Sequence, residues 1–209
     1  SRFVDDYRKM EGHSGIGAID DEAPQPLIFR SKFGVFAVVV TGLITNKNKL
    51  VSKLLNEGVS FSEMAGGGVN NAELVAALIN RGDNIVEGIA SMRGIIEGSV
   101  CALVLTQEGI YAARDKVGRF PLALGKSREP DKKSFVVATE VSSFENLGYE
   151  LFRFLGPGEI VLLSPQGIRQ LKPEGPDLKI CSFLWIYTGS PSSTYEGIGV
   201  EDTRERCGR

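Results

Sequence analysis

Cysteine and histidine are the residue types in this sequence best suited to nucleophilic or metal chemistry. The cysteines, Cys101, Cys181 and Cys207, are odd in number and far apart, which disfavours a disulfide framework. Cys181 is interpreted as a small thiol of the core. Because His13 is the one histidine and no C-x-x-C pair occurs, spacing identifies no complete metal site, and we predict neither a metal nor another cofactor.

Three further segments have compositions that could form a binding or catalytic site. The glycine-rich AGGGVNNAE (65–73) could cradle a phosphate, but it lacks the Lys-Ser/Thr of a P-loop and the spacing of a dinucleotide fingerprint. The adjacent acidic residues 20–22 could act as acids or bases, yet their loop-like setting is more typical of a solvated charge run. The basic segment 114–133 is likewise interpreted as a solvated hairpin and loop.

The composition is that of an ordinary water-soluble globule. Of the 209 residues, 42% are hydrophobic and 24% are charged. The net charge of −2 argues against a nucleic-acid surface, because neutralising phosphates needs a net basic face. No apolar run reaches the roughly 18 residues of a membrane helix, and the start of the sequence has no apolar signal-peptide core. We therefore expect a cytoplasmic protein without a membrane contact.

The first half of the sequence predicts one strand and three helices that would position a site. VVVTGLITN (38–46) indicates a strand, a tight turn at Gly42 and the start of a helix. Asn70 is predicted to cap a later helix, with Glu73 completing a capping box. Helices are predicted over residues 46–58, 70–82 and 84–96.

From Gly98 the hydrophobic period changes from helical to extended. Two hairpins are predicted to turn at residues 107–109 and 165–167, and FVVATE (135–140) is predicted to be a strand leading into a short helix. Helices followed by antiparallel hairpins favour an α+β fold, with a sheet packed under helices, over βαβ repeats.

Seven segments, in order along the chain, carry a family resemblance. Together they resemble the N-terminal glutaminase half of glutamine phosphoribosylpyrophosphate amidotransferase, a class II glutamine amidotransferase with the N-terminal-nucleophile hydrolase fold. The resemblance covers almost all 209 residues. The segments are GHSGIG (12–17), PQPLIFRSKFG (24–34), GLITN (42–46), AARDKVGRFPLALGK (112–126), FVVATE (135–140), GPGEIVLLSPQG (156–167) and ICSFLWIYTGSPSS (180–193).

The resemblance implies a fold and a chemistry. The fold is a four-layer αββα sandwich of antiparallel sheets, which can be incomplete here because the family's first strands would precede Ser1. The chemistry is hydrolysis of glutamine by an N-terminal cysteine, with the chain's α-amino group as base. An Asn side chain and a Gly backbone N–H form the oxyanion hole. An Arg and an Asp bind the carboxylate and the amine of glutamine.

Most of these chemical groups are replaced at the matching positions. Gly42 is retained, but Thr41 stands where the family has the Asn of the oxyanion hole, and neutral Asn71 stands where it has the Asp. No residue after GIG substitutes for the carboxylate-binding Arg. Ser1 has a charged context that does not suit a buried nucleophile. We therefore predict no catalytic residue, and we predict Thr41, Gly42 and Asn71 as degenerate remnants of a glutamine-binding pocket.

Three hypotheses of function remain. The first is a domain without glutaminase activity that acts as a scaffold, oligomerisation or regulatory unit beside a phosphoribosyltransferase-like domain or subunit of purine nucleotide biosynthesis. The second is an active amidotransferase half whose nucleophile segment lies upstream of these residues. The third is a small-ligand binding module that reuses the pocket, lined by Gly42, Asn71 and the triple-glycine loop. In each case a homo-oligomer is expected.

The last predicted feature is a domain boundary. The Pro- and Gly-rich KPEGPDLK (172–179) is the best candidate for a linker. It divides the chain into an amidotransferase-like domain of residues 1–179 and a bridge of residues 180–209. The bridge resembles the lead into the family's phosphoribosyltransferase domain.

Overall fold

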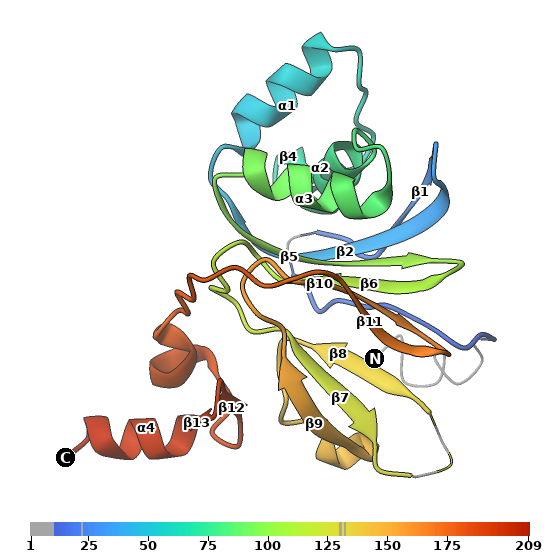
Figure 1. Cartoon of the computed structure of the whole chain (residues 1–209). Coiled ribbons are helices and arrows are strands. Elements are labelled where there is room, and N and C mark those ends of the chain that lie inside the picture. Colours follow the sequence, from blue (N-terminus) through green and yellow to red (C-terminus); the bar gives the residue numbers. More distant parts are fainter. Residues whose placement is uncertain (1–10, 22, 130, 132) are drawn as a thin grey trace.

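The computed structural model describes residues 11–21, 23–129, 131 and 133–209 (Figure 1). Ser1, considered above as a nucleophile, lies outside the described residues. The expected α+β sandwich of antiparallel sheets is confirmed: helices cover one face of a large sheet, and a smaller sheet lies against its other face. In the part of the chain that the structure describes, no helix is long and apolar enough to cross a membrane.

The large sheet has six antiparallel strands in the order β1-β2-β5-β6-β10-β11. Side chains alternate between its two faces along β2: Phe36, Val38 and Val40 belong to the core under the helices, so Val39 and Thr41 face the other way. The strands are β1 (Leu27–Ser31), β2 (Gly34–Ile44), β5 (Gly98–Thr106), β6 (Gly109–Ala113), β10 (Ile160–Ser164) and β11 (Gly167–Lys172). Both predicted hairpins are confirmed as β5–β6 and β10–β11.

Three helices form the layer above the large sheet: α1 (Lys47–Asn56), α2 (Asn71–Ile79) and α3 (Ile85–Ile95). Helix α2 is buried almost all round, because it lies between the sheet and its neighbours. Helix α3 approaches it closely at Gly88, where a Cβ atom would lie 2.1 Å from the carbonyl oxygen of Ile79. A glycine at this position therefore sets the spacing of the two helices.

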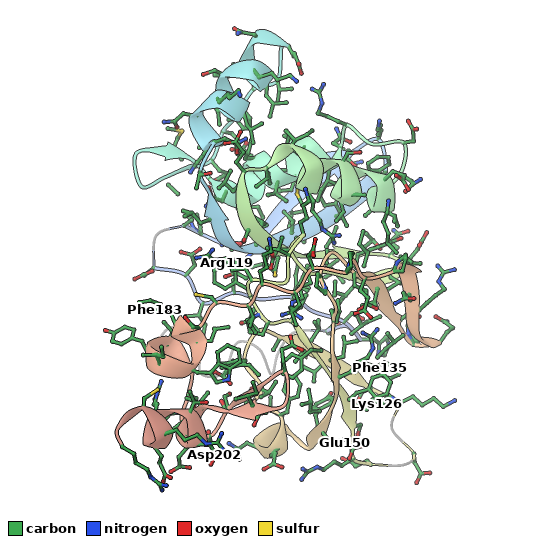
Figure 2. The ribbon with its side chains drawn as sticks, turned by 60° about the vertical axis from the view of Figure 1, so that its left-hand side comes forward. Arg119, Lys126, Phe135, Glu150, Phe183 and Asp202 are labelled. Atoms are coloured by element: carbon green, nitrogen blue, oxygen red, sulfur yellow. The ribbon has the colours of Figure 1, made fainter. Side chains whose placement is uncertain are left out.

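The smaller sheet has three antiparallel strands in the order β8-β7-β9: β8 (Phe135–Ala138), β7 (Ala123–Ser127) and β9 (Tyr149–Phe154). Lys126 lies opposite Phe135 and Glu150 in this sheet (Figure 2). Leu124 of β7 packs into a second core with residues of the large sheet. On the opposite face of β7, buried Phe144 covers Gly125 and leads into the 3-10 helix η2 (Glu145–Leu147), which supplies helical structure on the outer side.

Residues 180–209, here called the C-terminal module, have a small core of their own. Trp185, Tyr195 and Val200 are buried together, with the rings of Trp185 and Tyr195 edge to face at 6.0 Å. The module lies beside the smaller sheet (Figure 1). Its elements are η3 (Leu184–Thr188), β12 (Thr194–Tyr195), β13 (Ile198–Gly199) and α4 (Val200–Cys207).

Two local predictions are wrong. Gly42 does not form a turn: β2 continues through it to Ile44 and stays paired with β5. The glycine is required there because its φ of +126° would strain a residue with a side chain, and because the missing Cβ leaves room for the Ser99 carbonyl. Asn70 caps α2 through its side chain as predicted, but Glu73 forms no capping box. Its carboxylate instead accepts hydrogen bonds from the N–H groups of Ser62 and Glu63, which fix the preceding loop.

The close contact at Gly42 makes a prediction about stability. In Gly42→Ala the new Cβ would lie 1.9 Å from the Ser99 carbonyl oxygen, so two central strands must separate. We expect a loss of about 3 kcal/mol in the free energy of unfolding, measured by denaturant titration.

Gly167→Ala is the matched control. Gly167 has a similar φ of +134° but nothing within 4 Å of its Cβ position, so only backbone strain of about 1 kcal/mol is expected. Equal losses in the two variants would contradict the proposed role of the strand contact.

Candidate functional site

A cavity of about 490 Å³ brings together the three residues predicted from the sequence, Thr41, Gly42 and Asn71. It is lined by β2 and β5 of the large sheet, by Leu122 and the 137–139 segment at β8 on the other side, by the start of α2 and by residues of the loop 17–25. The volume is within the range of small-molecule sites. The triple-glycine loop is a tight hairpin, β3 (Met64–Ala65) to β4 (Gly68–Val69), and its residues are not among the described residues lining the cavity.

Gln25 holds the loop 17–25 against the large sheet. Its side-chain oxygen accepts a hydrogen bond from the N–H of Val40 at 2.7 Å, and its side-chain nitrogen donates to the Asp20 carboxylate at 2.7 Å. The Asn70 side chain donates to the Pro24 carbonyl at 3.0 Å. These contacts hold the loop so that Asp20 and Asp21 belong to the lining of the cavity.

Asn71 is the first residue of α2 and contributes an unsatisfied acceptor. Its side-chain oxygen Oδ1 is buried and has no hydrogen-bond partner among the described residues. Leaving a buried acceptor unpaired costs about 1–3 kcal/mol. A ligand that donates a hydrogen bond at this point would recover that cost.

Cys101 lies opposite Thr41 in the β2–β5 pairing and is the cysteine that lines the cavity. Its thiol is buried and donates to the Asp115 carboxylate over 3.8 Å, while the Asp115 N–H donates to the sulfur at 3.4 Å. Burial, and then the negative charge of Asp115, raise the pKa of the Cys101 thiol to about 12. At neutral pH the group is therefore a neutral thiol, and the nucleophilic thiolate is scarce.

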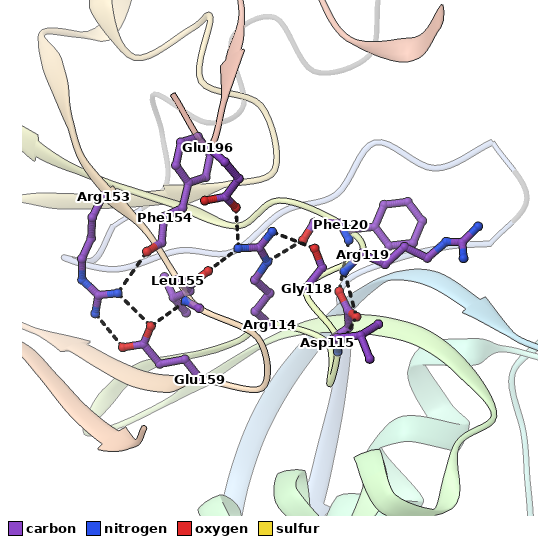
Figure 3. Close-up of polar contacts among 12 residues, drawn as sticks. Arg114, Asp115, Gly118, Arg119, Phe120, Arg153, Phe154, Leu155, Glu159 and Glu196 are labelled. Carbon is purple, nitrogen blue, oxygen red and sulfur yellow. Dashed lines mark hydrogen bonds and ion pairs between the residues drawn. The ribbon is translucent and has the colours of Figure 1, made fainter. Parts of the chain in front are cut away.

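Behind this cysteine, buried Asp115 organises the turn 115–120 (Figure 3). Its carboxylate accepts hydrogen bonds from the backbone N–H groups of Val117, Arg119 and Phe120 at 3.0–3.1 Å. The turn therefore has a fixed shape, and it carries Phe120 and the following residues up to Leu122 at the cavity wall.

Arg114 is fully buried, and so are Asp115 and residues 121–125, so interpreting the segment 114–133 as solvated is wrong for these residues. The guanidinium donates to the backbone carbonyls of Phe120, Gly118 and Leu155 (Figure 3). The physical reason is that backbone carbonyls at the junction of the two sheets need a donor that reaches several at once, and Arg carries five N–H donors in a planar fork. A run of charged residues in the sequence does not show that one of them is needed as a donor to buried backbone carbonyls.

The same guanidinium binds the C-terminal module through Glu196. A carboxylate oxygen of Glu196 lies 2.7 Å from Nη1 of Arg114 (Figure 3). This contact is an ion pair without an aligned hydrogen bond: Nη1 of Arg114 donates to the Leu155 carbonyl, and the Glu196 oxygen accepts no hydrogen bond from the described residues. Tyr195 adds a second attachment, since its hydroxyl donates to the Glu140 carboxylate at 2.8 Å.

A second buried ion pair stabilises the turn between β9 and β10. Arg153 donates two hydrogen bonds of 2.7 Å to the carboxylate of buried Glu159. Burial acts to raise the pKa of Glu159, but hydrogen bonds from Arg153, Gln170 and the Gly156 N–H outweigh it and hold the pKa below its usual value. This pair is structural and does not reach the cavity.

The remaining sequence candidates do not join the site. Cys181 is half-buried at the start of the C-terminal module rather than in the main core, and Cys207 is exposed on α4. His13 is exposed. Among the residues that the structure describes, no group of three His, Cys, Asp or Glu side chains could hold a metal ion.

Comparisons with known proteins agree with the fold. Residues 15–146 match the family model described as glutamine amidotransferase domain. Amidophosphoribosyltransferase of Mus musculus is 28% identical over 215 residues, with 94% of this chain and 42% of the relative covered. The same enzyme of Bacillus subtilis is 28% identical over 211 residues, with 96% and 43% covered. The chain thus spans about two fifths of these relatives.

Solved structures of amidotransferases have the same fold as this chain. The glutamine phosphoribosylpyrophosphate amidotransferase of B. subtilis complexed with ADP and GMP superposes with a TM-score of 0.76 at 28% identity. The match covers 88% of this chain and 39% of that structure.

The raised pKa of Cys101 makes a prediction about reactivity. At pH 8 iodoacetamide is expected to label exposed Cys207 at least about 100-fold faster than Cys101, because the thiolate fraction of Cys101 is low and its sulfur is enclosed. Peptide mass spectrometry after timed quenching measures both rates in one sample. After unfolding in urea the two rates should converge; similar rates in the native protein would contradict a neutral, enclosed thiol.

The ion pair between Arg114 and Glu196 makes a prediction about the C-terminal module. Glu196→Ala leaves a fully buried guanidinium without its carboxylate, and we expect a loss of about 2 kcal/mol in stability. Hydrogen exchange should rise first in residues 180–209. Glu145→Ala is the control, since the pair of Glu145 with Arg128 is exposed and is worth at most about 1 kcal/mol. Unchanged exchange in the module would refute the attachment.

Proposed function

We propose that this chain, which belongs to the glutamine amidotransferase domain family, is a domain that has lost glutaminase activity and serves as a scaffold or regulatory unit. Its partner would be a phosphoribosyltransferase-like domain or subunit, as in the amidophosphoribosyltransferases to which it is similar. Because the chain spans only 42% of the mouse relative, the transferase reaction is proposed for that partner and not for these residues. A cytoplasmic homo-oligomer in purine nucleotide biosynthesis is part of the same proposal.

The observation that carries the proposal is the contrast between the cavity's backbone and its side chains. The strand glycine, the helix cap and the cavity itself are all present. Thr41, however, has a hydroxyl one bond from Cβ and cannot place a donor where a longer Asn amide would. Removing one oxyanion donor costs about 10²- to 10³-fold in rate in acyl-transfer enzymes.

The cavity also offers no activated nucleophile among its described residues. Cys101 is the one sulfur in its lining, and its pKa of about 12 keeps the thiol protonated. Activation would require a base or a positive environment that lowers this pKa. Instead, Asp115 raises it. The chemistry of this thiol therefore supports a structural role.

Exposed apolar side chains support the role as a scaffold. Phe183, Ile186 and Tyr187, at and beside η3, are 60%, 56% and 78% exposed. Phe183 projects from the module in Figure 2. Neighbouring exposed apolar residues of this kind mark contact surfaces. We propose that the C-terminal module, residues 180–209, is the bridge between the amidotransferase-like domain of residues 1–179 and its partner.

A second candidate function is glutamine hydrolysis with a nucleophile supplied from residues outside this sequence. The observation that favours it is the unsatisfied oxygen of Asn71 in the preserved cavity, which could accept a hydrogen bond from a substrate ammonium. The two candidates differ in a single measurable reaction.

That reaction is the release of glutamate from glutamine. For the natural full-length protein we expect no release above the uncatalysed rate and no covalent labelling by a glutamine-analogue chloroketone. Ammonium should still support any phosphoribosylamine formation, because the transferase reaction would then not need the cavity. The B. subtilis amidophosphoribosyltransferase is the positive control. Glutamate release and stoichiometric labelling would establish the second candidate instead.

A further inference from the structure

We propose that a second cavity, separate from the candidate site, binds a small molecule that carries a phosphate group. This cavity has a volume of about 340 Å³ and lies between the end of α3, the turn after β6, the turn 157–158 and the segment 172–175. It shares no lining residue with the candidate site in the part of the chain that the structure describes. Its size suits a phosphate group with a small organic part.

The charged side chains of this lining are mostly cationic. Arg93, Lys116 and Lys172 carry positive charge, and Glu174 is the one carboxylate among the described lining residues. The three cations come from α3, from the turn after β6 and from the end of β11, so the fold and not a run of basic residues brings them together. An anion in this cavity would be attracted by all three.

Arg93 contributes a partly buried charge that lacks a carboxylate partner. Its terminal nitrogens donate to the backbone carbonyls of Gly158 and Glu159, which uses two of the five N–H groups of a guanidinium. Its Nε is buried and has no hydrogen-bond partner among the described residues. Burial lowers the pKa of Arg93 to about 10, and the attraction of nearby Asp115 does not offset this effect. An anion close to the guanidinium would therefore stabilise its charge.

Two carboxylates outside the lining lie near these cations. Asp115 already accepts hydrogen bonds from three backbone N–H groups of its own turn and from the Cys101 thiol. Glu87 lies 3.8 Å from the amino group of Lys172, but the two side chains are 55% and 41% exposed. Exposed pairs of this kind are weak. Neither carboxylate therefore neutralises the cluster.

Two negative contributions act at the cavity itself. Glu174 packs against Gly156, where an added Cβ would lie 1.7 Å from its Oε2, and its charge also attracts Arg153. The C-terminal end of α3 adds about half a negative unit. The three lining cations exceed these two contributions together. The excess of positive charge favours an anionic ligand over a neutral molecule or a cation.

A phosphate group matches the site in charge and in geometry. It carries about two negative charges at neutral pH, and its oxygens accept hydrogen bonds from several donors at once. Arg pairs with phosphate through its planar fork, and Lys binds it as a compact charge. The ligand class is therefore a small phosphomonoester or a diphosphate.

Protection of the two lysines from acetylation tests the site. Peptide mass spectrometry of the natural full-length protein follows each lysine separately, so phosphate bound elsewhere does not contribute. Pyrophosphate or glycerol 3-phosphate should slow the acetylation of Lys116 and Lys172 by about 3-fold or more, because a bound anion raises the pKa of an amine and only the free amine reacts. Exposed Lys53 and Lys179, outside the lining, are the controls and should react at unchanged rates.

The choice of anions separates binding from screening. The anion that protects at the lower concentration identifies the ligand as a diphosphate or as a phosphomonoester. Absence of protection by both, or equal protection by sodium chloride at the same ionic strength, would overturn the proposal.

Two variants connect the protection to named residues. Glu174→Gln removes the carboxylate of the lining and should lower the pyrophosphate concentration for half-maximal protection about 3- to 10-fold. Arg93→Gln should raise it about 10-fold or more. Because Arg93 also contacts two carbonyls, circular dichroism must show that this variant folds, and the Glu174 variant tests the site if it does not.

Asp177→Asn is the matched control. Asp177 is an exposed carboxylate close to Glu174 in the sequence but outside the lining, so no change is expected. Equal half-maximal concentrations in Glu174→Gln, Asp177→Asn and the unchanged protein would overturn the proposal. None of these outcomes bears on glutaminase activity, because the site is independent of the candidate cavity.

Discussion

The buried guanidinium of Arg114 is the interaction on which the assembly of the described structure depends most. It lies where the large sheet, the turn 115–120 and the end of β9 meet. It donates to two backbone carbonyls of the turn, those of Gly118 and Phe120, and to the carbonyl of Leu155 just after β9. Its charge is then balanced by Glu196 from the C-terminal module. A buried cation is tolerated only with such partners, so the position of each segment constrains the others.

The cavity is a consequence of this junction. Asp115, next to Arg114, holds the turn that leads to Leu122, and it also contacts the Cys101 thiol on the cavity floor. The distance between the two sheets at the cavity is therefore set by polar contacts behind it. These contacts do not involve the side chains of Thr41 or Asn71, so they do not depend on which residues stand at those positions of the lining.

Local patterns predicted much of the fold. The helices, both hairpins, the Asn70 cap and the α+β class follow from periodicity and turn residues that act within a few positions of one another. Thr41, Gly42 and Asn71, which the resemblance grouped as remnants of one pocket, all line a single cavity although they belong to two elements; that this cavity is a former glutamine site stays a prediction. The turn at Gly42 and the capping box at Glu73 were wrong because their real partners, Ser99 and the Ser62–Glu63 backbone, lie on other elements.

The sequence by itself determined the periodic elements, their order and the chemical types available at the candidate site, since these depend on side-chain identity and short spacing. Only the tertiary structure decided that Arg114 is buried, that Cys101 is a neutral thiol at the cavity and that Asp20 and Asp21 belong to the lining of the same cavity. The reason is physical: burial, pKa and net local charge are properties of groups brought together from distant parts of the chain, and no local pattern contains them.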